Sequence, residues 1–198
     1  PISSRVAGNS IILVSNSVIY SETIDDGIIP RVSSGENGSD MKDEMVRSGD
    51  IAVANAANPE GFLIVSKTNL DTLESKPEAT ALLGGGSDIY CTDSTVYVAT
   101  ECCDTKSEKI NTKLTSFDIT GEKPQLKASG AVEGTMLDTF SMDEYNGYIR
   151  VAVTRSGDTP VFVQKWEMLN TDGSPLCVET FAAPLRSTVT SFVFRLES

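Results

Sequence analysis

The chain has 198 residues, and its 16 basic and 28 acidic side chains give a formal net charge of −12. It contains no histidine, which excludes Ser-His-Asp and Cys-His catalysis, His-ligated zinc and histidine proton relays. The negative charge argues against nucleic acids and anionic membrane surfaces as partners, because both would repel the chain. The longest aliphatic run, residues 11–14, is far shorter than the roughly 20 residues that a membrane helix needs.

The N-terminal part is predicted to contain inner strands, a long acidic stretch and an outer strand. Residues 5–14 and 18–20 are the expected inner strands, and residues 61–68 form the outer one. The stretch 21–50 is predicted to be a mobile, solvated insertion with one helical turn over 41–46, and it is the first candidate for a recognition loop. Its acidic residues are Glu22, Asp25, Asp26, Glu36, Asp40, Asp43, Glu44 and Asp50.

Calcium binding is the alternative use of these carboxylates, since calcium takes about six to eight oxygen ligands. Their spacing lacks the order of an EF-hand loop. The stretch is therefore predicted to be a solvated loop without a metal.

From residue 79 onward, apolar side chains alternate with a period of two, as in Ile149, Val151 and Val153, which is typical of half-buried strands. The predicted strands fall into groups of four, separated by turn formers. The groups are 79–84, 87–92, 95–101 and 112–119, then 126–133, 136–142, 147–154 and 160–168, and finally an incomplete group of 176–183 and 187–196.

A repeat of about 50 residues with four strands is the period of a β-propeller blade. The sequence therefore predicts an all-β chain, one partial propeller domain over residues 1–198, with about three and a half blades of four antiparallel strands. Closed propellers have about four to eight blades, so we expect a piece of a longer propeller or pairing of open blade edges with another copy. A β-sandwich is the alternative all-β architecture.

The segment 129–154 (SGAVEGTMLDTFSMDEYNGYIRVAVT) is distinctive. With residues 4–6, 81–90 and 96–100, it resembles a family of secreted bacterial and archaeal proteins that carry a C-terminal β-propeller distantly similar to WD40 repeats. The resemblance covers most of residues 3–154. It implies a propeller, an extracellular or cell-envelope location and a chain that is normally longer, and it implies no catalytic residues.

The motif 140–147 brings two carboxylates, Asp143 and Glu144, side by side. Neighbours in a strand point to opposite faces, so in a strand the two would not converge on one proton or metal ion. The predicted structure is a hairpin closed by Asn146-Gly147, in which both carboxylates accept hydrogen bonds from turn amides. Cation binding and acid/base chemistry are the alternatives.

The remaining candidates have structural interpretations. Gly84-Gly85-Gly86 lacks the Lys-Ser/Thr of a phosphate loop, so it is predicted to allow close backbone approach or a bulge. Trp166 is predicted to pack in the core, with a ligand platform as the alternative. No organised disulfide set and no zinc site are expected from the four cysteines, which are Cys91, Cys102, Cys103 and Cys177.

The sequence thus assigns no catalytic, cofactor-binding or metal-binding residue. The predicted function is a secreted or cell-surface propeller module that binds a protein or a glycan without catalysis. The alternative is a propeller hydrolase, lyase or oxidoreductase whose essential residues lie partly outside this chain. An enzyme should cluster carboxylates, or Arg and Tyr, with shifted pKa values, whereas a binding module should expose an apolar or aromatic patch.

Overall fold

The computed structural model describes residues 3–19, 28–35, 42–53, 61–73, 75–104, 109–145, 148–154, 168–170, 175–176 and 189–193. The regular elements within these ranges are β-strands and three short 3-10 helices, so the all-β prediction is confirmed. The turn predicted over 41–46 is wrong, because strand β4 (Lys42–Met45) occupies this position and pairs with β3 (Arg31–Ser34).

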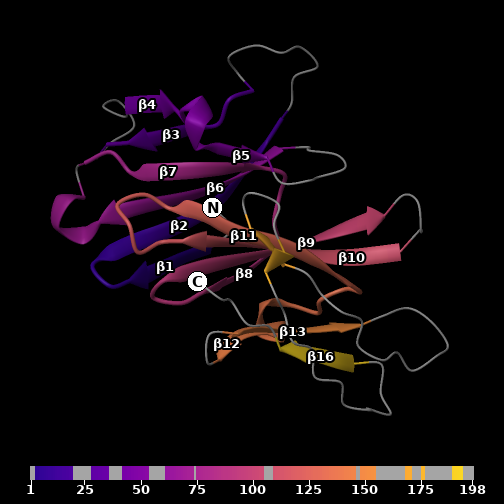
Figure 1. Cartoon of the computed structure of the whole chain (residues 1–198). Helices are drawn as coiled ribbons and strands as arrows, with labels where there is room; N and C mark the ends of the chain where they lie inside the picture. Colours follow the sequence, from indigo (N-terminus) through magenta and orange to yellow (C-terminus); the bar gives the residue numbers. More distant parts are fainter. Residues whose placement is uncertain are drawn as a thin grey trace. The chain divides into compact units, whose positions relative to one another are not determined.

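The first sheet has the strand order β1-β2-β6-β7-β5. Four of its strands are antiparallel neighbours, and Figure 1 shows them side by side in this order. The short fifth strand pairs parallel with β7. The bounds are β1 (Ser3–Ala7), β2 (Ser10–Val18), β5 (Ile51–Val53), β6 (Gly61–Asn69) and β7 (Glu78–Leu83).

The central strand β6 is buried on both faces from Gly61 to Ser66, which explains its continuous apolar run Phe-Leu-Ile-Val. At its start, Gly61 pairs with Val18 of β2. A Cβ atom at Gly61 would lie 2.2 Å from the carbonyl oxygen of Ser17, so only glycine fits there. The close approach of these two strands therefore depends on one residue.

The described part of the predicted acidic insertion packs on this sheet. After the β3–β4 hairpin, the 3-10 helix η1 (Ser48–Asp50) leads into β5, which covers the outer edge of β7. Val46 shares a buried cluster with Phe62, Ile64 and Ala81 of the sheet. Partly buried apolar residues of the same segment complete this cluster, namely Ile28, Val32 and Ile51.

The second sheet has the strand order β15-β14-β11-β10-β9-β8. The connections between β8, β9, β10 and β11 are three to six residues long, too short for a parallel crossover, so these four strands form an antiparallel meander. Their bounds are β8 (Asp88–Cys91), β9 (Thr95–Asp104), β10 (Lys109–Asp118) and β11 (Gln125–Glu133), with β14 (Met168–Asn170) and β15 (Pro175–Leu176) beyond β11.

The third sheet has the order β12-β13-β16, built from β12 (Met142–Tyr145), β13 (Tyr148–Thr154) and β16 (Val189–Val193). Tyr145 pairs with Tyr148, which confirms the predicted hairpin with two residues between its strands. Residues 160–167, predicted to pair with β13, lie outside the described residues. Among those described, β16 takes that position.

The predicted grouping of strands into blades is displaced by one strand. The sequence analysis places 79–84 and 126–133 at the start of a group. In the structure, β7 is the last strand of the first sheet in chain order and pairs with β6, and β11 is next to β10 in the second sheet. The misleading feature is the short connection 84–87, which looks like a hairpin. Gly84 begins it with a φ of 126°, and the chain leaves β7 there to enter another sheet.

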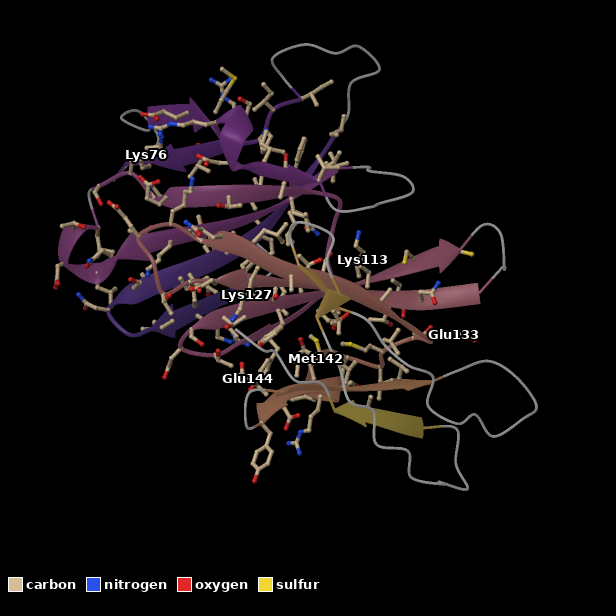
Figure 2. The ribbon with its side chains drawn as sticks, viewed as in Figure 1. Lys76, Lys113, Lys127, Glu133, Met142 and Glu144 are labelled. Carbon is tan, nitrogen blue, oxygen red and sulfur yellow. The ribbon has the colours of Figure 1, made fainter. Side chains whose placement is uncertain are left out.

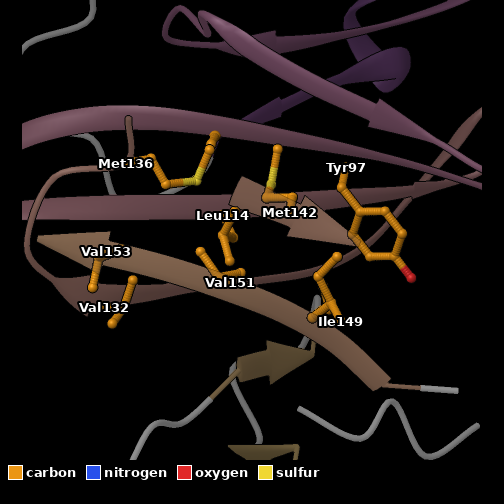
Figure 3. Packing of buried hydrophobic residues seen from close by; sticks show 10 residues of the cluster. Tyr97, Leu114, Val132, Met136, Met142, Ile149, Val151 and Val153 are labelled. Atoms are coloured by element: carbon orange, nitrogen blue, oxygen red, sulfur yellow. The ribbon is translucent and has the colours of Figure 1, made fainter. Parts of the chain in front are cut away.

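The chain divides into two compact units, each with its own core. The first contains Pro1–Ser87, Asp93–Val96 and Phe117–Leu126, and the second contains the rest. Figure 3 shows the core of the second unit, where side chains of β9, β10, β11, β12 and β13 meet. Its buried residues are Tyr97, Ala99, Leu114, Ala128, Val132, Met136, Met142, Ile149, Val151 and Val153. The prediction of a single domain is not decided by this division and stays a prediction.

Candidate functional site

The connection between β11 and β12, residues 134–141, is held against the end of its sheet by hydrogen bonds. It begins at Gly134, whose φ of 126° lies in the region that favours glycine. The amide of Gly134 donates to the carbonyl of Ile110 at 2.8 Å, and its carbonyl accepts from the hydroxyl of Thr112 at 2.7 Å. The connection therefore runs beside the first residues of β10.

The second half of this connection is one 3-10 turn, η3 (Thr139–Ser141), which is bonded at both ends. The carboxylate of Asp138 caps the turn by accepting from the amide of Phe140 at 2.9 Å. The hydroxyl of Thr139 donates to the carbonyl of Ile89 at 2.9 Å and accepts from its amide at 3.0 Å. The turn is thereby fixed to β8.

Two methionines anchor the connection in the core of the second unit. Met136 lies within it and Met142 directly follows it, and both are buried. Figure 3 shows both side chains among the apolar residues of this core. The loop is therefore held by packing as well as by hydrogen bonds.

Two large apolar side chains of this loop nevertheless lie in solvent. Leu137 is 87% exposed and Phe140 is 92% exposed, although neighbouring residues of the loop are buried or bonded. Ile110, whose carbonyl holds the loop, is 45% exposed. We call the two exposed side chains of this loop, Leu137 and Phe140, the end patch. Large exposed apolar groups on a rigid loop are typical of recognition surfaces.

The two adjacent carboxylates of the predicted hairpin do not converge. Both lie in strand β12, where neighbouring side chains point to opposite faces. Asp143 accepts a hydrogen bond from Nε of Arg150 at 2.7 Å, and this bond raises the pKa of the guanidinium. Glu144 accepts from the hydroxyl of Tyr97 at 2.8 Å. The predicted bonds to turn amides are wrong, because cross-strand and core partners take both carboxylates.

Two carboxylates of the acidic stretch bind lysines of the first unit. Glu44 pairs with Lys76, which precedes β7, and Asp50 pairs with Lys123, which precedes β11. These pairs fasten the insertion to its own unit. Of the other acidic residues, Asp43 has a described backbone only, and the rest lie outside the described residues, namely Glu22, Asp25, Asp26, Glu36 and Asp40.

The comparison with known families agrees with the four-stranded meanders. The family described as "Beta propeller domain" matches residues 1–178. The chain belongs to this β-propeller family. The comparison with curated proteins and the comparison with solved structures each return no match. The predicted fold class, an all-β partial propeller, is confirmed.

In this propeller the triple glycine ends a blade. Gly84 donates its amide to the carbonyl of Gly61 at 2.9 Å, and the carbonyl of Gly86 accepts from Nδ2 of Asn16 at 3.0 Å. Gly84 and Gly86 thus bond to β6 and β2. Gly84 favours glycine because of its φ of 126°, whereas a Cβ atom at Gly85 would meet open space, so close backbone approach does not explain the glycine there.

The remaining sequence candidates bring no cluster of ligands together in the described part of the propeller. Cys91, Cys102 and Cys103 form no disulfide with one another, and Cys177 and Trp166 lie outside the described residues. No group of three Cys, Asp or Glu residues that could hold a metal ion occurs among the residues described. Across the same residues, no helix has the length and apolar character to cross a membrane.

The sequence analysis missed Leu137 and singled out Phe140 only as part of a hairpin motif. Both side chains fall in the strand predicted over 136–142, and that strand is wrong, because a loop and the 3-10 turn η3 occupy these positions before β12 begins at Met142. The usable signal is Asp138, a residue type that favours turns over strands. Large apolar residues in a segment without strand periodicity have no sheet face to cover. Whether such residues fold back into the core or stay exposed depends on tertiary contacts.

Proposed function

We propose that this propeller is a non-catalytic recognition module, exported to the cell surface or the surroundings of a bacterium or archaeon, that binds a protein or a glycan through the end patch. The observation that carries the proposal is the exposure of Leu137 and Phe140 on a loop that is bonded on both sides. A rigid loop loses little conformational entropy when it binds, so exposed apolar groups on it are effective anchors. The location rests on the family resemblance alone.

The geometry favours recognition over catalysis at this place. The polar groups of the loop are engaged in holding its backbone, as the Asp138 cap and the Thr139 bonds show. The side chains that the loop presents to solvent, Leu137 and Phe140, carry no group that can transfer a proton or attack a substrate. Apolar and aromatic side chains of this kind supply contact area instead.

The test compares three proteins on a glycan array and on a displayed random-peptide library. They are the unsubstituted chain, the double variant L137S/F140S and the control variant Leu73→Ser. Leu73 is 58% exposed on the connection between β6 and β7, so it controls for the loss of an exposed apolar group elsewhere.

We expect at least one of the two collections to contain ligands that bind both the unsubstituted chain and Leu73→Ser. The double variant L137S/F140S should bind the same ligands at least about tenfold more weakly. Because both replaced side chains are exposed, the double variant should keep the unfolding temperature of the unsubstituted chain. Ligands that bind all three proteins equally, or no ligand in either collection, would contradict the proposal.

A further inference from the structure

We infer that the partner of the end patch is a polypeptide segment in which basic side chains flank apolar ones. This inference rests on the proposed function and adds the chemistry of the ligand. It follows from which residues the antiparallel meander β8–β11 places at the end of the sheet where the end patch lies.

Antiparallel order brings specific parts of the four strands to this end. The last residues of β9 and β11 lie there together with the first residues of β10, and the shorter strand β8 begins where the turn η3 is bonded. Two hydrogen bonds place the loop at the starts of β10 and β8, since Gly134 bonds to Ile110 and Thr139 bonds to Ile89. The charged side chains near the end patch can therefore be identified from strand position.

This end of the sheet is rich in carboxylates. Its described acidic residues are Asp88, which begins β8, Glu101 in the last part of β9, Glu133, which ends β11, and Asp138 in the loop. Strand β10 places two lysines at the same end, Lys109 as its first residue and Lys113 at the level of Glu101, and burial lowers the pKa of the Lys113 ammonium group. Lys127 lies toward the opposite end of β11 from Glu133, as Figure 2 shows.

An apolar anchor surrounded by negative charge selects its partner in two ways. Leu137 and Phe140 need apolar side chains to cover them, and the nearby carboxylates favour cations at the rim of the interface. The formal net charge of −12 on the whole chain adds a long-range attraction for the same partner. Phe140 offers an aromatic face to either kind of partner, whereas Leu137 has no face for sugar stacking and is covered best by an apolar side chain, which favours a polypeptide over a glycan.

The experiment uses three matched synthetic peptides and fluorescence anisotropy. The first has a Leu/Phe core with lysine flanks, the second has the same core with glutamate flanks, and the third has a serine core with lysine flanks. We expect the first peptide to bind most tightly, and both other peptides at least about tenfold more weakly. Raising the salt concentration should weaken the first peptide, because rim charges are screened.

Variants of the chain locate the binding surface. L137S/F140S should weaken the first peptide at least about tenfold, and D88N/E101Q should weaken it about threefold or more. The control variant Glu122→Gln, an exposed carboxylate on the connection between β10 and β11, should bind like the unsubstituted chain. Equal binding of the glutamate-flanked peptide, or equal binding by L137S/F140S, would overturn the inference.

Two further outcomes separate this inference from the proposed function. Loss of an array glycan in L137S/F140S without any peptide binding would overturn the polypeptide partner and leave recognition by the end patch intact. A solution mass of a dimer that L137S/F140S reduces to a monomer would show that a second copy covers the patch, and would also overturn the inference. Absence of both glycan and peptide binding would contradict both proposals.

Discussion

Single residues in this propeller have roles that depend on what lies within a few ångströms of them. Gly61 is enclosed by the backbone of β2, whereas Gly49 in η1 has open space where a Cβ atom would lie. Asp143 and Glu144 are neighbours in sequence, yet one binds Arg150 across the hairpin and the other binds the buried Tyr97. Residue type alone therefore does not tell which of the two glycines is confined, or which partner each of the two carboxylates binds.

Gly61→Ala should destabilise the chain by about 1–3 kcal/mol, because the new methyl group would force β6 away from the Ser17 carbonyl. Gly49→Ala is the matched control and should change the free energy of unfolding by less than about 0.5 kcal/mol. Urea unfolding followed by circular dichroism measures both values. Equal free energies of unfolding for the two variants would show that β2 and β6 can move apart at Gly61 without loss of stability.

At the scale of elements, the insertion between β2 and β6 acts as a cover for the edge of a blade. Its strand β5 pairs with β7, and Val46 packs into the apolar cluster of the sheet. A row of unpaired backbone groups at an outer edge would otherwise be open to pairing with other chains. The two lysine–carboxylate pairs act at either side of this cover.

Lys123→Met should loosen this cover more than Lys76→Met does. The Asp50–Lys123 pair is less exposed than the Glu44–Lys76 pair, so loss of Lys123 leaves Asp50 with few water contacts. We expect a loss of about 1–2 kcal/mol for Lys123→Met and at most about 0.5 kcal/mol for Lys76→Met. Hydrogen exchange of the β5 and β7 amides reports the loosening directly, and equal exchange in both variants would be the contrary result.

At the scale of the whole molecule, two compact units share three strands. The first residues of β9 and β11 and the last residues of β10 belong to the first unit, and the remainder of each strand belongs to the second. Each of these strands is one continuous element. Disruption of either core should therefore also break backbone hydrogen bonds of strands that belong partly to the other unit. We therefore expect the two units to unfold in one transition.

Leu63→Ala in the first unit and Leu114→Ala in the second should therefore shift one common unfolding transition. Both side chains are fully buried, and each truncation should cost about 2–5 kcal/mol. Differential scanning calorimetry of both variants checks this, with Leu73→Ala at an exposed position as the control. Two resolved transitions, each sensitive to only one variant, would show that the units unfold separately and would contradict the predicted single domain.

Much of the fold could be predicted from sequence because its signals are local. Alternation in 149–153 and the Asn-Gly between Tyr145 and Tyr148 predict a hairpin that the pairing confirms. The roughly 50-residue repeat predicts four-stranded blades, and the family match agrees. The blade boundaries were not predictable in the same way, because a four-residue connection such as 84–87 suits a hairpin as well as a step into the next sheet.

By itself, the sequence determined the all-β class, the repeat, the negative charge and the absence of histidine chemistry, since each depends on composition or on neighbouring residues. Tertiary structure decided which strands pair, which lysines bind Glu44 and Asp50, and that Leu137 and Phe140 lie in solvent while Met136 and Met142 are buried. These four apolar residues have similar hydrophobicity. Their exposure differs because the loop donates hydrogen bonds to the carbonyls of Ile110 and Ile89 and accepts one from the hydroxyl of Thr112, and these bonds hold it in one orientation.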